Sequence, residues 1–287
     1  MFMDMALFLE ELDGLFAAKK FKEAGEYLFS GLERAEREND REAELSICNE
    51  LGGYCRVTAR FEEGVKVFEK AMRAIDALGL CGTEHEATTM LNYATLSVHS
   101  GKPEQALEQY RVAEKIYAEL NPGSDYRVAA LNNNMASMYI RLHDYEKAAK
   151  CAERALEIME LTGTDSDEIA VTLSLKAQIY AGLGEYEKAF DELKKAEAAY
   201  AGVKDPGVMH TAVTCATFGE VCGKLGKYAQ AGGYYEKALS LIEQNFGRNL
   251  HYASVLRGFA ACKGAQGDRE GESKYISEAE LIEKASG

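Results

Sequence analysis

The chain has 287 residues, of which 47% are hydrophobic, and its formal net charge of −14 gives a pI of about 5.0. Such an acidic surface repels phosphate backbones and anionic lipids, which excludes nucleic acid and membrane surfaces as expected partners. Only three prolines and no tryptophan occur. Alanine, leucine, glutamate and lysine are abundant, so the composition predicts an all-helical protein.

The opening segment MFMDMALFLEEL carries early acidic residues and no basic n-region, so we expect no signal peptide. No apolar run is long enough to span a bilayer. The chain has seven cysteines, an odd number, and none of them forms a CxxC pair. This pattern favours a reducing compartment, and we expect a cytoplasmic protein.

A seven-fold internal repeat runs along the chain, marked by segments that resemble GxYxxA and end 40 to 42 residues apart. These segments are KKFKEA, ARFEEG, GKPEQA, HDYEKA, GEYEKA, GKYAQA and GDREGE, which end at Ala24, Gly64, Ala106, Ala148, Ala189, Ala231 and Glu272. Periods of this size are typical of solenoids, in which stacked helix pairs share one continuous core.

Each unit contains two helical patterns, A and B, around a short turn, and we number each unit so that its segment ends at position 20. The predicted units are approximately 5–42, 45–82, 87–124, 129–166, 170–207, 212–249 and 253–286. They fill the chain, so we predict a single solenoid domain over 1–287. Position 27 is always Gly or Ala, and position 24 is mostly large, which indicates closely packed helices. Position 17 is usually aromatic, from Phe21 to Tyr228.

This pattern resembles the tetratricopeptide repeat family, and LKAQIYAGLGEYEKAFDELKKA (175–196) is the most similar single copy. The usual unit of that family has 34 residues. The longer unit found here and the segments ATTMLNYATL and AALNNNMASMY resemble the kinesin-light-chain type. The resemblance implies an all-α, right-handed superhelical solenoid of about seven antiparallel helix pairs, whose A helices line a concave groove.

Positions 6, 9 and 13 of helix A form a stripe on one helix face, and this stripe carries the candidate binding residues. It reads Asn92, Thr95, His99 in the third unit and Asn134, Ser137, Arg141 in the fourth. In the sixth unit it reads Thr217, Glu220, Lys224, and neighbouring candidates are Asn49, Arg56, Asn133 and Gln178. An Asn amide can pair with both groups of a peptide bond, and Arg suits carboxylates. We therefore predict an extended peptide ligand with local acidic character.

The resemblance implies peptide contacts for Asn92, Asn133 and Asn134, because groove asparagines of the kinesin-light-chain and bacterial peptide-sensor branches bind peptides. The carboxylate clamp of chaperone adaptors is not expected, since position 9 never holds Asn. Asn132 differs from the other two asparagines of its run, because position 4 faces the packing side and requires a hydrogen-bond partner.

Catalytic and metal-binding motifs are absent from the sequence, so we expect no enzyme activity, no cofactor and no metal. Cys48, Cys55, Cys215 and Cys222 occupy core-facing positions, whereas Cys81 lies in a linker. His85, His210 and His251 recur just before helix A, where we expect capping or packing.

The predicted function is that of a non-catalytic scaffold which captures an extended peptide or partner segment in its groove. The alternative is a stand-alone peptide-sensing regulator related to bacterial receptors, since the first repeat begins within about ten residues of Met1 and leaves no space for an effector domain. An enzyme is a third alternative, which the missing motifs disfavour.

Overall fold

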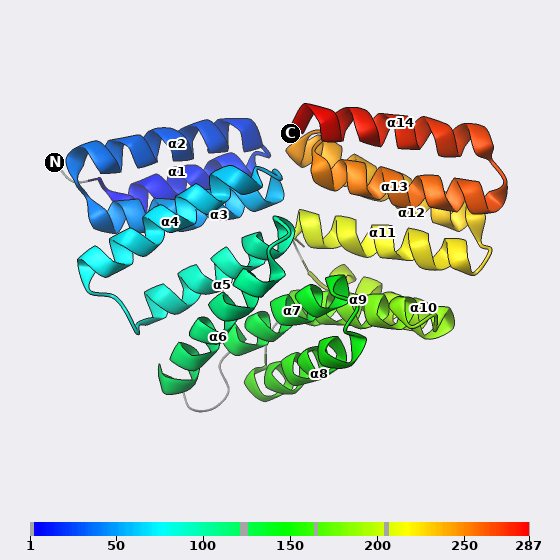
Figure 1. The fold of residues 1–287 in the computed structure, drawn as a ribbon, viewed down its shortest axis with the longest axis horizontal. Coiled ribbons are helices and arrows are strands. Elements are labelled where there is room, and N and C mark those ends of the chain that lie inside the picture. Colours follow the sequence, from blue (N-terminus) through cyan, green and yellow to red (C-terminus); the bar gives the residue numbers. More distant parts are fainter. Residues whose placement is uncertain (1–2, 121–125, 164–165, 204–206, 287) are drawn as a thin grey trace. The chain divides into compact units, whose positions relative to one another are not determined.

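The structure is a computed structural model that describes residues 3–120, 126–163, 166–203 and 207–286. Within these ranges the chain is all helical, with fourteen α-helices and no strand (Figure 1). The chain divides into two compact units, Met1–Gly123 and Ser124–Gly287, which we call the N-terminal and C-terminal units.

The N-terminal unit contains three helix pairs, drawn from blue to blue-green in Figure 1. Its helices are α1 (Met5–Ala17), α2 (Phe21–Glu38), α3 (Arg41–Val57), α4 (Phe61–Leu78), α5 (Glu84–His99) and α6 (Pro103–Leu120). In each pair the second helix runs back along the first, and successive pairs pack through contacts of α2 with α3 and of α4 with α5.

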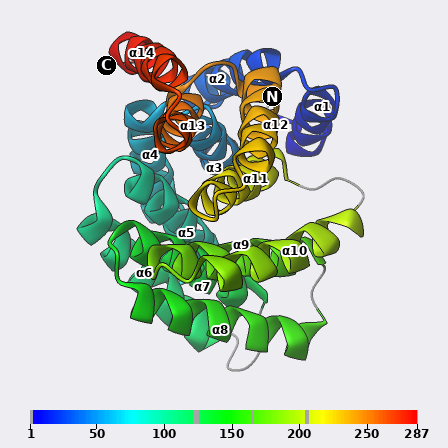
Figure 2. The same cartoon turned by 90° about the vertical axis from the view of Figure 1, so that its right-hand side faces the viewer.

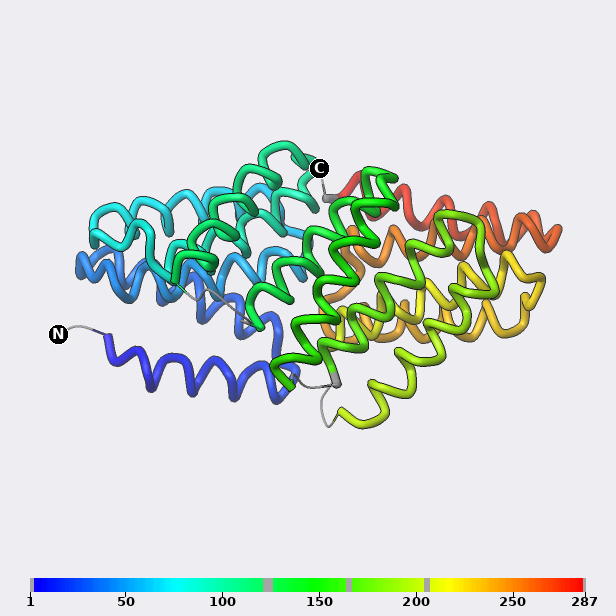
Figure 3. The backbone as a smooth tube through the Cα atoms, turned by 90° about the horizontal axis from the view of Figure 1, so that it is seen from below, coloured from blue at the N-terminus to red at the C-terminus, as the bar shows by residue number. Residues whose placement is uncertain are grey.

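The C-terminal unit contains four helix pairs, and Figures 2 and 3 show their antiparallel course. Its helices are α7 (Tyr126–Arg141), α8 (Tyr145–Thr162), α9 (Ser166–Gly182), α10 (Tyr186–Ala201), α11 (Val208–Lys224), α12 (Tyr228–Phe246), α13 (Leu250–Gln266) and α14 (Arg269–Ser286). The first helices of successive pairs are neighbours, because α7 contacts α9, α9 contacts α11 and α11 contacts α13.

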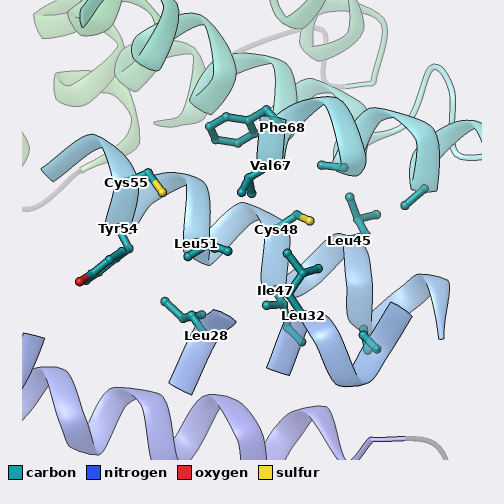
Figure 4. Close-up of a cluster of buried hydrophobic side chains, with 14 of the residues drawn as sticks. Leu28, Leu32, Leu45, Ile47, Cys48, Leu51, Tyr54, Cys55, Val67 and Phe68 are labelled. Carbon is teal, nitrogen blue, oxygen red and sulfur yellow. The ribbon is translucent and has the colours of Figure 1, made fainter. Parts of the chain in front are cut away.

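Small and large side chains alternate where the helices approach most closely. Figure 4 shows Leu28 of α2, Leu51 of α3 and Phe68 of α4 in one apolar cluster. A Cβ atom added to Gly52 of α3 would lie 2.3 Å from Phe68 Cζ, so only glycine lets that ring approach. Gly52 lies at position 8 of its unit and Phe68 at position 24, and their contact confirms the close helix packing that the sequence predicts.

Every turn between an A and a B helix holds its position-15 residue at positive φ. Four of these residues are glycines, which adopt this conformation without steric cost. The other three are Lys19, Ala59 and His143, with φ angles of 58°, 60° and 57°. The repeat therefore requires a left-handed residue at this place whether or not the sequence supplies glycine.

Position 17 is the first residue of every B helix, from Phe21 of α2 to Arg269 of α14. Tyr145 shows what its aromatic ring does, because a Cβ added to Gly182 of the next pair would lie 2.2 Å from Tyr145 Cζ. The ring at the start of α8 thus packs directly against the end of α9. The aromatic anchor predicted at this position fixes one helix pair to the next.

Candidate functional site

Side chains at unit position 5 join neighbouring A helices, the odd-numbered helices of the fold. In the N-terminal unit, Asn49 Nδ2 of α3 donates to Thr89 Oγ1 of α5 at 3.0 Å and to the Leu45 carbonyl at 3.2 Å. Thr89 is fully buried. The oxygen of the same amide, Asn49 Oδ1, is buried and has no hydrogen-bond partner among the described residues. The Asn49 amide therefore links α3 to α5 and keeps one unused acceptor.

Two further links of this kind occur in the C-terminal unit. Thr172 Oγ1 of α9 donates to Asn133 Oδ1 of α7 at 2.9 Å. Ser174 Oγ of α9 lies 2.8 Å from Thr214 Oγ1 of α11, within hydrogen-bonding distance. All four side chains are buried. We call these two pairs, together with Asn49–Thr89, the polar seam.

Two predicted groove residues, Asn49 and Asn133, belong to the polar seam between helices. The sequence predicts that Asn49 and Asn133 face an open groove, but Asn133 is only 4% exposed and Asn49 is half-buried. The physical reason is the threonine at position 3 of the next A helix, whose hydroxyl satisfies the amide at short range. Both asparagines hold helices together, and contact with a ligand stays a prediction for them.

Asn132 is half-buried and forms its hydrogen bond within its own helix. Its Nδ2 donates to the carbonyl of Val128, one turn earlier, at 2.7 Å. The predicted need for a partner is therefore met locally. The three asparagines of the run have three different environments, since Asn133 lies in the seam and Asn134 is partly exposed.

The partly open polar side chains of the A helices in the C-terminal unit form a second set, which we call the open polar row. Its members are Asn134, Ser137 and Arg141 of α7, Gln178 of α9 and Lys224 of α11. Arg141 and Lys224 are exposed and the other three are half-buried. Among the described residues, none of these five makes a hydrogen bond or an ion pair within the chain. All five were predicted from the sequence as ligand contacts.

The corresponding stripe in the N-terminal unit is mostly occupied by internal contacts. Thr95 Oγ1 donates to the Leu91 carbonyl at 3.0 Å and lies 3.3 Å from the Tyr110 hydroxyl. His99 stacks on Phe61, with 5.9 Å between ring centroids. Asn92 is half-buried and makes no hydrogen bond with another described residue. Of the predicted triplet, only Asn92 is thus still available to a ligand.

Two other cationic side chains of the A helices differ from Arg141. Arg56 of α3 is half-buried, and burial lowers the pKa of its guanidinium. Arg257 of α13 makes a two-pronged ion pair with Glu283 of α14, through Nε at 2.7 Å and a second nitrogen at 2.5 Å. Arg257 therefore joins the two helices of the last pair, and Arg141 and Lys224 are the cations that stay open in the described part of this face.

A group of acidic and polar side chains lies around the first turns of α9, and we call it the acidic corner. Its members are Asp167 and Glu168 of α9, Tyr200 of α10 and Asn133 of α7. Three of its atoms are buried and make no hydrogen bond of normal geometry with the described residues, namely Asp167 Oδ1, the Tyr200 hydroxyl and Asn133 Nδ2, although the Asn133 amide lies near Glu168 and the Tyr200 hydroxyl near Thr214 and Ser174. The sequence analysis missed this corner, because acids in the first turn of a helix are common and read as dipole partners.

The electrostatics of the acidic corner show how its members affect one another. Burial raises the pKa of Asp167. Burial also raises the pKa of Glu168, the charge of Asp167 adds to this shift, and the Asn133 amide opposes it. Burial raises the pKa of Tyr200 to about 12; the charges of Asp167 and Glu168 add to this rise, whereas hydrogen bonding with Thr214 and Ser174 opposes it. The corner is therefore a partly desolvated acidic site, and no ion pair to either carboxylate occurs among the described residues.

The cysteines and histidines show no arrangement for chemistry. Cys48, Cys55, Cys215 and Cys222 are buried as predicted, and Cys81 is exposed. Burial raises the pKa of Cys48 and Cys55 to about 12, so both thiols stay protonated at neutral pH. No group of three or more His, Cys, Asp or Glu side chains able to hold a metal ion occurs among the described residues.

At the start of α13, the recurring histidine His251 is not the residue that caps the helix. Asn249 caps α13, and its Oδ1 accepts from the backbone N–H groups of His251 and Tyr252 at 2.9 and 3.2 Å. His85 and His210 are exposed.

In the part of the chain that the structure covers, no helix is long and apolar enough to cross a membrane.

Comparison with protein families gives two matches, both to tetratricopeptide repeats, at residues 127–201 and 212–245. Two curated relatives are similar to the chain, both from Arabidopsis thaliana. "Protein KINESIN LIGHT CHAIN-RELATED 2" is 23% identical over 73% of this chain, and "Protein KINESIN LIGHT CHAIN-RELATED 1" is 25% identical over 68% of it. The chain spans 32% of the length of each relative.

Solved structures share the fold at low sequence identity. A Rap protein complexed with Competence and Sporulation Factor has a TM-score of 0.66 at 14% identity, with 98% of each chain covered. A tetratricopeptide repeat protein from Parabacteroides merdae has a TM-score of 0.55 at 16% identity, with 96% of this chain and 92% of that chain covered. BtubC from P. vanneervenii has a TM-score of 0.52 at 21% identity, over 80% and 91% of the two chains.

Proposed function

Since the chain is a tetratricopeptide repeat protein with kinesin-light-chain-like repeats, we propose that it is a non-catalytic scaffold which captures an extended peptide or partner segment on its A helices. The fold is that of a scaffold. The proposal adds the kind of ligand, the residues that hold it and a cytoplasmic location, which the reducing character of the cysteine pattern favours.

The observation that carries the proposal is the open polar row of the C-terminal unit. Natural proteins usually satisfy half-buried amides and hydroxyls internally, as the polar seam does with Asn49 and Ser174. Asn134, Ser137 and Gln178 are half-buried and have no such partner among the described residues. Their donors and acceptors therefore suit the N–H and C=O groups of an extended main chain.

Arg141 and Lys224 give the row its charge preference. Both side chains are exposed at the carboxyl ends of their helices, and no ion pair within the described chain neutralises them. A guanidinium binds a carboxylate through two parallel hydrogen bonds, so Arg141 favours an acidic residue of the ligand. The strongly acidic remainder of the protein keeps other acidic chains away, which restricts such contacts to this row.

The second candidate is a stand-alone peptide-sensing regulator, and its fold is shared by a Rap protein complexed with Competence and Sporulation Factor. At 14% identity this likeness shows the fold alone, and the regulator would use the same open polar row. An enzyme has no support in the site, because the row contains no nucleophile paired with a base and no metal cluster occurs in the described residues.

The experiment is a selection from a phage-displayed random-peptide library, followed by fluorescence anisotropy on the selected peptides. We expect Asn134→Ala combined with Arg141→Glu to weaken binding at least about tenfold, since both main-chain and carboxylate contacts are lost. The helical circular dichroism signal should not change. The control is Lys237→Glu on α12, an exposed cation of the same unit, which should leave affinity within about twofold.

A library that yields no binder would overturn peptide capture. Binders whose affinity ignores the double substitution would move the ligand away from the open polar row. A signal that depends on phosphatase, esterase or peptidase turnover, lost on a single row substitution, would instead restore the enzyme.

A further inference from the structure

We propose that a pocket between α2 and the α3–α4 turn of the N-terminal unit binds a neutral aromatic side chain of a partner protein, a tryptophan or a tyrosine. The pocket is lined mainly by a B helix, whereas the open polar row lies on A helices of the C-terminal unit. The proposal therefore concerns a second binding surface, which goes beyond the proposed function and does not depend on it.

The pocket has a volume of about 450 Å³, and its lining comes from one stripe of α2, from Tyr54 of α3 and from Arg60, the residue before α4. Pockets that hold small organic groups measure roughly 300–1,000 Å³. The lining residues of α2 follow one another at helical spacing from Lys22 to Glu33, so they share one helix face. There is thus room for one bicyclic ring such as indole.

Two aromatic rings and a glycine form the apolar floor of the pocket. Phe29 is half-buried and Tyr54 is buried. A Cβ atom added to Gly25 would lie 2.3 Å from Tyr54 Oη, so the tyrosine occupies the place of a side chain on α2. Figure 4 shows Tyr54 at the edge of the apolar cluster, pointing away from Leu51. A floor of this kind favours an apolar ring in the pocket.

Both rings are exceptions to the repeat pattern. Phe29 occupies unit position 25, where each of the other six units has a polar or charged residue. Tyr54 occupies position 10, where no other unit has an aromatic residue. The other units pack without these rings, so the solenoid itself does not require them. Their meeting at one pocket is therefore better explained by a ligand.

Arg60 places a planar cation beside the floor. Its guanidinium carbon lies 4.7 Å from the centroid of the Phe29 ring. Burial raises the pKa of Tyr54 and the neighbouring Arg60 opposes this rise, so the guanidinium is close to both rings. Arg60 is exposed and lines the pocket. Because guanidinium planes stack on aromatic rings, Arg60 can cover a third ring that enters from the partner.

The cations of the rim already have carboxylate neighbours. Lys22 Nζ lies 3.8 Å from a carboxylate oxygen of Glu26, and an Arg60 nitrogen lies 2.5 Å from Glu63. An anionic ligand would compete with these acids, and a cationic ligand would meet the positive charges of Lys22 and Arg60. The rim therefore favours a neutral group.

Ser30 and Glu33 supply hydrogen-bond acceptors at the same rim. Both are exposed on α2, and neither makes a hydrogen bond with another described residue. A serine hydroxyl or a carboxylate accepts from an indole N–H or a phenol O–H. A tryptophan or tyrosine, with an apolar ring and one polar edge, matches this combination of floor and rim.

The test uses the composition of the chain. The chain contains no tryptophan, so the fluorescence of an added indole is observed without a protein background. The probes are N-acetyltryptophanamide, which is neutral, tryptamine, a cation, and indole-3-acetate, an anion. Each is titrated with the full chain and followed by fluorescence anisotropy. N-acetylleucinamide serves as a non-aromatic competitor.

Two variants alter the pocket without touching the open polar row. Ser30→Phe fills it from an exposed position of α2, and Phe29→Leu removes the aromatic floor but keeps an apolar side chain. The matched control is Ser277→Phe, a serine replaced in the same way at an exposed position of α14, outside the pocket. Circular dichroism verifies that each variant is folded.

We expect N-acetyltryptophanamide to bind with a dissociation constant on the order of 1 mM, the level of a single ring in a shallow site. Both charged indoles should bind at least about threefold more weakly, and the leucine amide should not displace the probe. Ser30→Phe and Phe29→Leu should weaken binding at least about fivefold, and Ser277→Phe should stay within about twofold. Equal binding of all three indoles, displacement by the leucine amide, or an affinity that Ser30→Phe leaves unchanged would overturn the site.

Peptides with a central tryptophan between random residues separate a partner protein from a free aromatic compound. Selected peptides should bind at least about tenfold more tightly than N-acetyltryptophanamide, because residues beside the ring add contacts, and Ser30→Phe should remove this gain. If no peptide exceeds the amide, the occupant is a free compound and the partner is overturned. Asn134→Ala combined with Arg141→Glu should bind these peptides as the wild-type protein does, so the pocket and the open polar row succeed or fail separately.

Discussion

The polar seams of the two units use the same repeat positions and differ in how completely they are satisfied. In the N-terminal unit, the Tyr117 hydroxyl lies 3.1 Å from Thr88 Oγ1, and one amide oxygen of Asn49 is the unused group of that seam. In the C-terminal unit, neither the equivalent Tyr200 hydroxyl nor Asn133 Nδ2 makes a hydrogen bond of normal geometry with another described residue, although Thr214 and Ser174 lie close enough to lower the pKa of Tyr200. Both seams thus join neighbouring helices, and the seam of the C-terminal unit buries more polar groups whose hydrogen bonds are incomplete.

The difference has a simple origin in sequence. The residue two places before position 1 is His85 in the N-terminal unit and Glu168 in the C-terminal unit. Its neighbour Glu86 is occupied by the Gly82 N–H, whereas no hydrogen bond to Asp167 Oδ1 is formed. A fixed backbone arrangement can therefore carry complete or incomplete hydrogen bonds, depending on the one or two side chains placed at a helix start.

The largest effect should come from removing the seam threonines, Thr172 in the C-terminal unit and Thr89 in the N-terminal unit. Thr172→Val leaves the buried Asn133 Oδ1 without its hydroxyl donor, so we expect a loss of about 2 kcal/mol in the free energy of unfolding. Thr89→Val should cost only about 1 kcal/mol, since Asn49 Nδ2 keeps its bond to the Leu45 carbonyl. Urea unfolding measures both, and equal losses would contradict the difference between the seams.

A smaller effect separates the turns of the two units. Ala59 in the N-terminal unit has φ of 60°, whereas Gly184 in the C-terminal unit has φ of 79° at the same repeat position. Ala59→Gly should stabilise the protein by about 1 kcal/mol, and Gly184→Ala should destabilise it by a similar amount. Thermal unfolding followed by circular dichroism checks the pair. If both substitutions shifted the melting temperature in the same direction, stability would not depend on which residue occupies the left-handed position of the turn.

Much of this architecture can be predicted from the sequence because it depends on periodic sterics. The small residue at Gly52 and the large one at Phe68 recur at fixed positions, and the helix pairs follow from them. The aromatic start of the B helices and the buried Cys48 and Cys222 follow in the same way. Periodicity reports which face of a helix a residue occupies, and that is sufficient for the fold.

The candidate site is less predictable, because it depends on partners in other repeats. Asn133 and Asn134 look equivalent in sequence, but only Asn133 meets a threonine hydroxyl from the next A helix. His99 is polar in sequence, although the structure stacks it on Phe61. The corner acids lack any pattern of their own, since Tyr200, which lies near them, comes more than thirty residues later in the sequence. Such contacts depend on the rotation of each helix against its neighbour, which periodicity does not fix.

The smallest effect concerns Glu168 and the burial of its carboxyl group. Burial raises its pKa in the folded chain above the unfolded value of about 4.3, so the folded state holds the proton more tightly. The stability that this provides is full below pH 4 and is lost as pH rises through the raised pKa. Asp167 shifts in the same direction, Tyr200 of α10 is coupled to both acids, and the facing groups Asn133 of α7 and Thr214 of α11 are neutral.

Glu168→Gln should therefore stabilise the free protein at pH 7, by about 0.5 kcal/mol because the carboxyl group is partly solvated. The gain should shrink as the pH falls toward 4, where glutamate is itself neutral. Glu86→Gln should give no gain, since it removes the carboxylate that accepts from the Gly82 N–H. Unfolding free energies measured across this pH range make the comparison. A gain at neutral pH would mean that the partly buried carboxylate of Glu168 costs stability, whereas a loss of stability would make Glu168 a structural residue like Glu86.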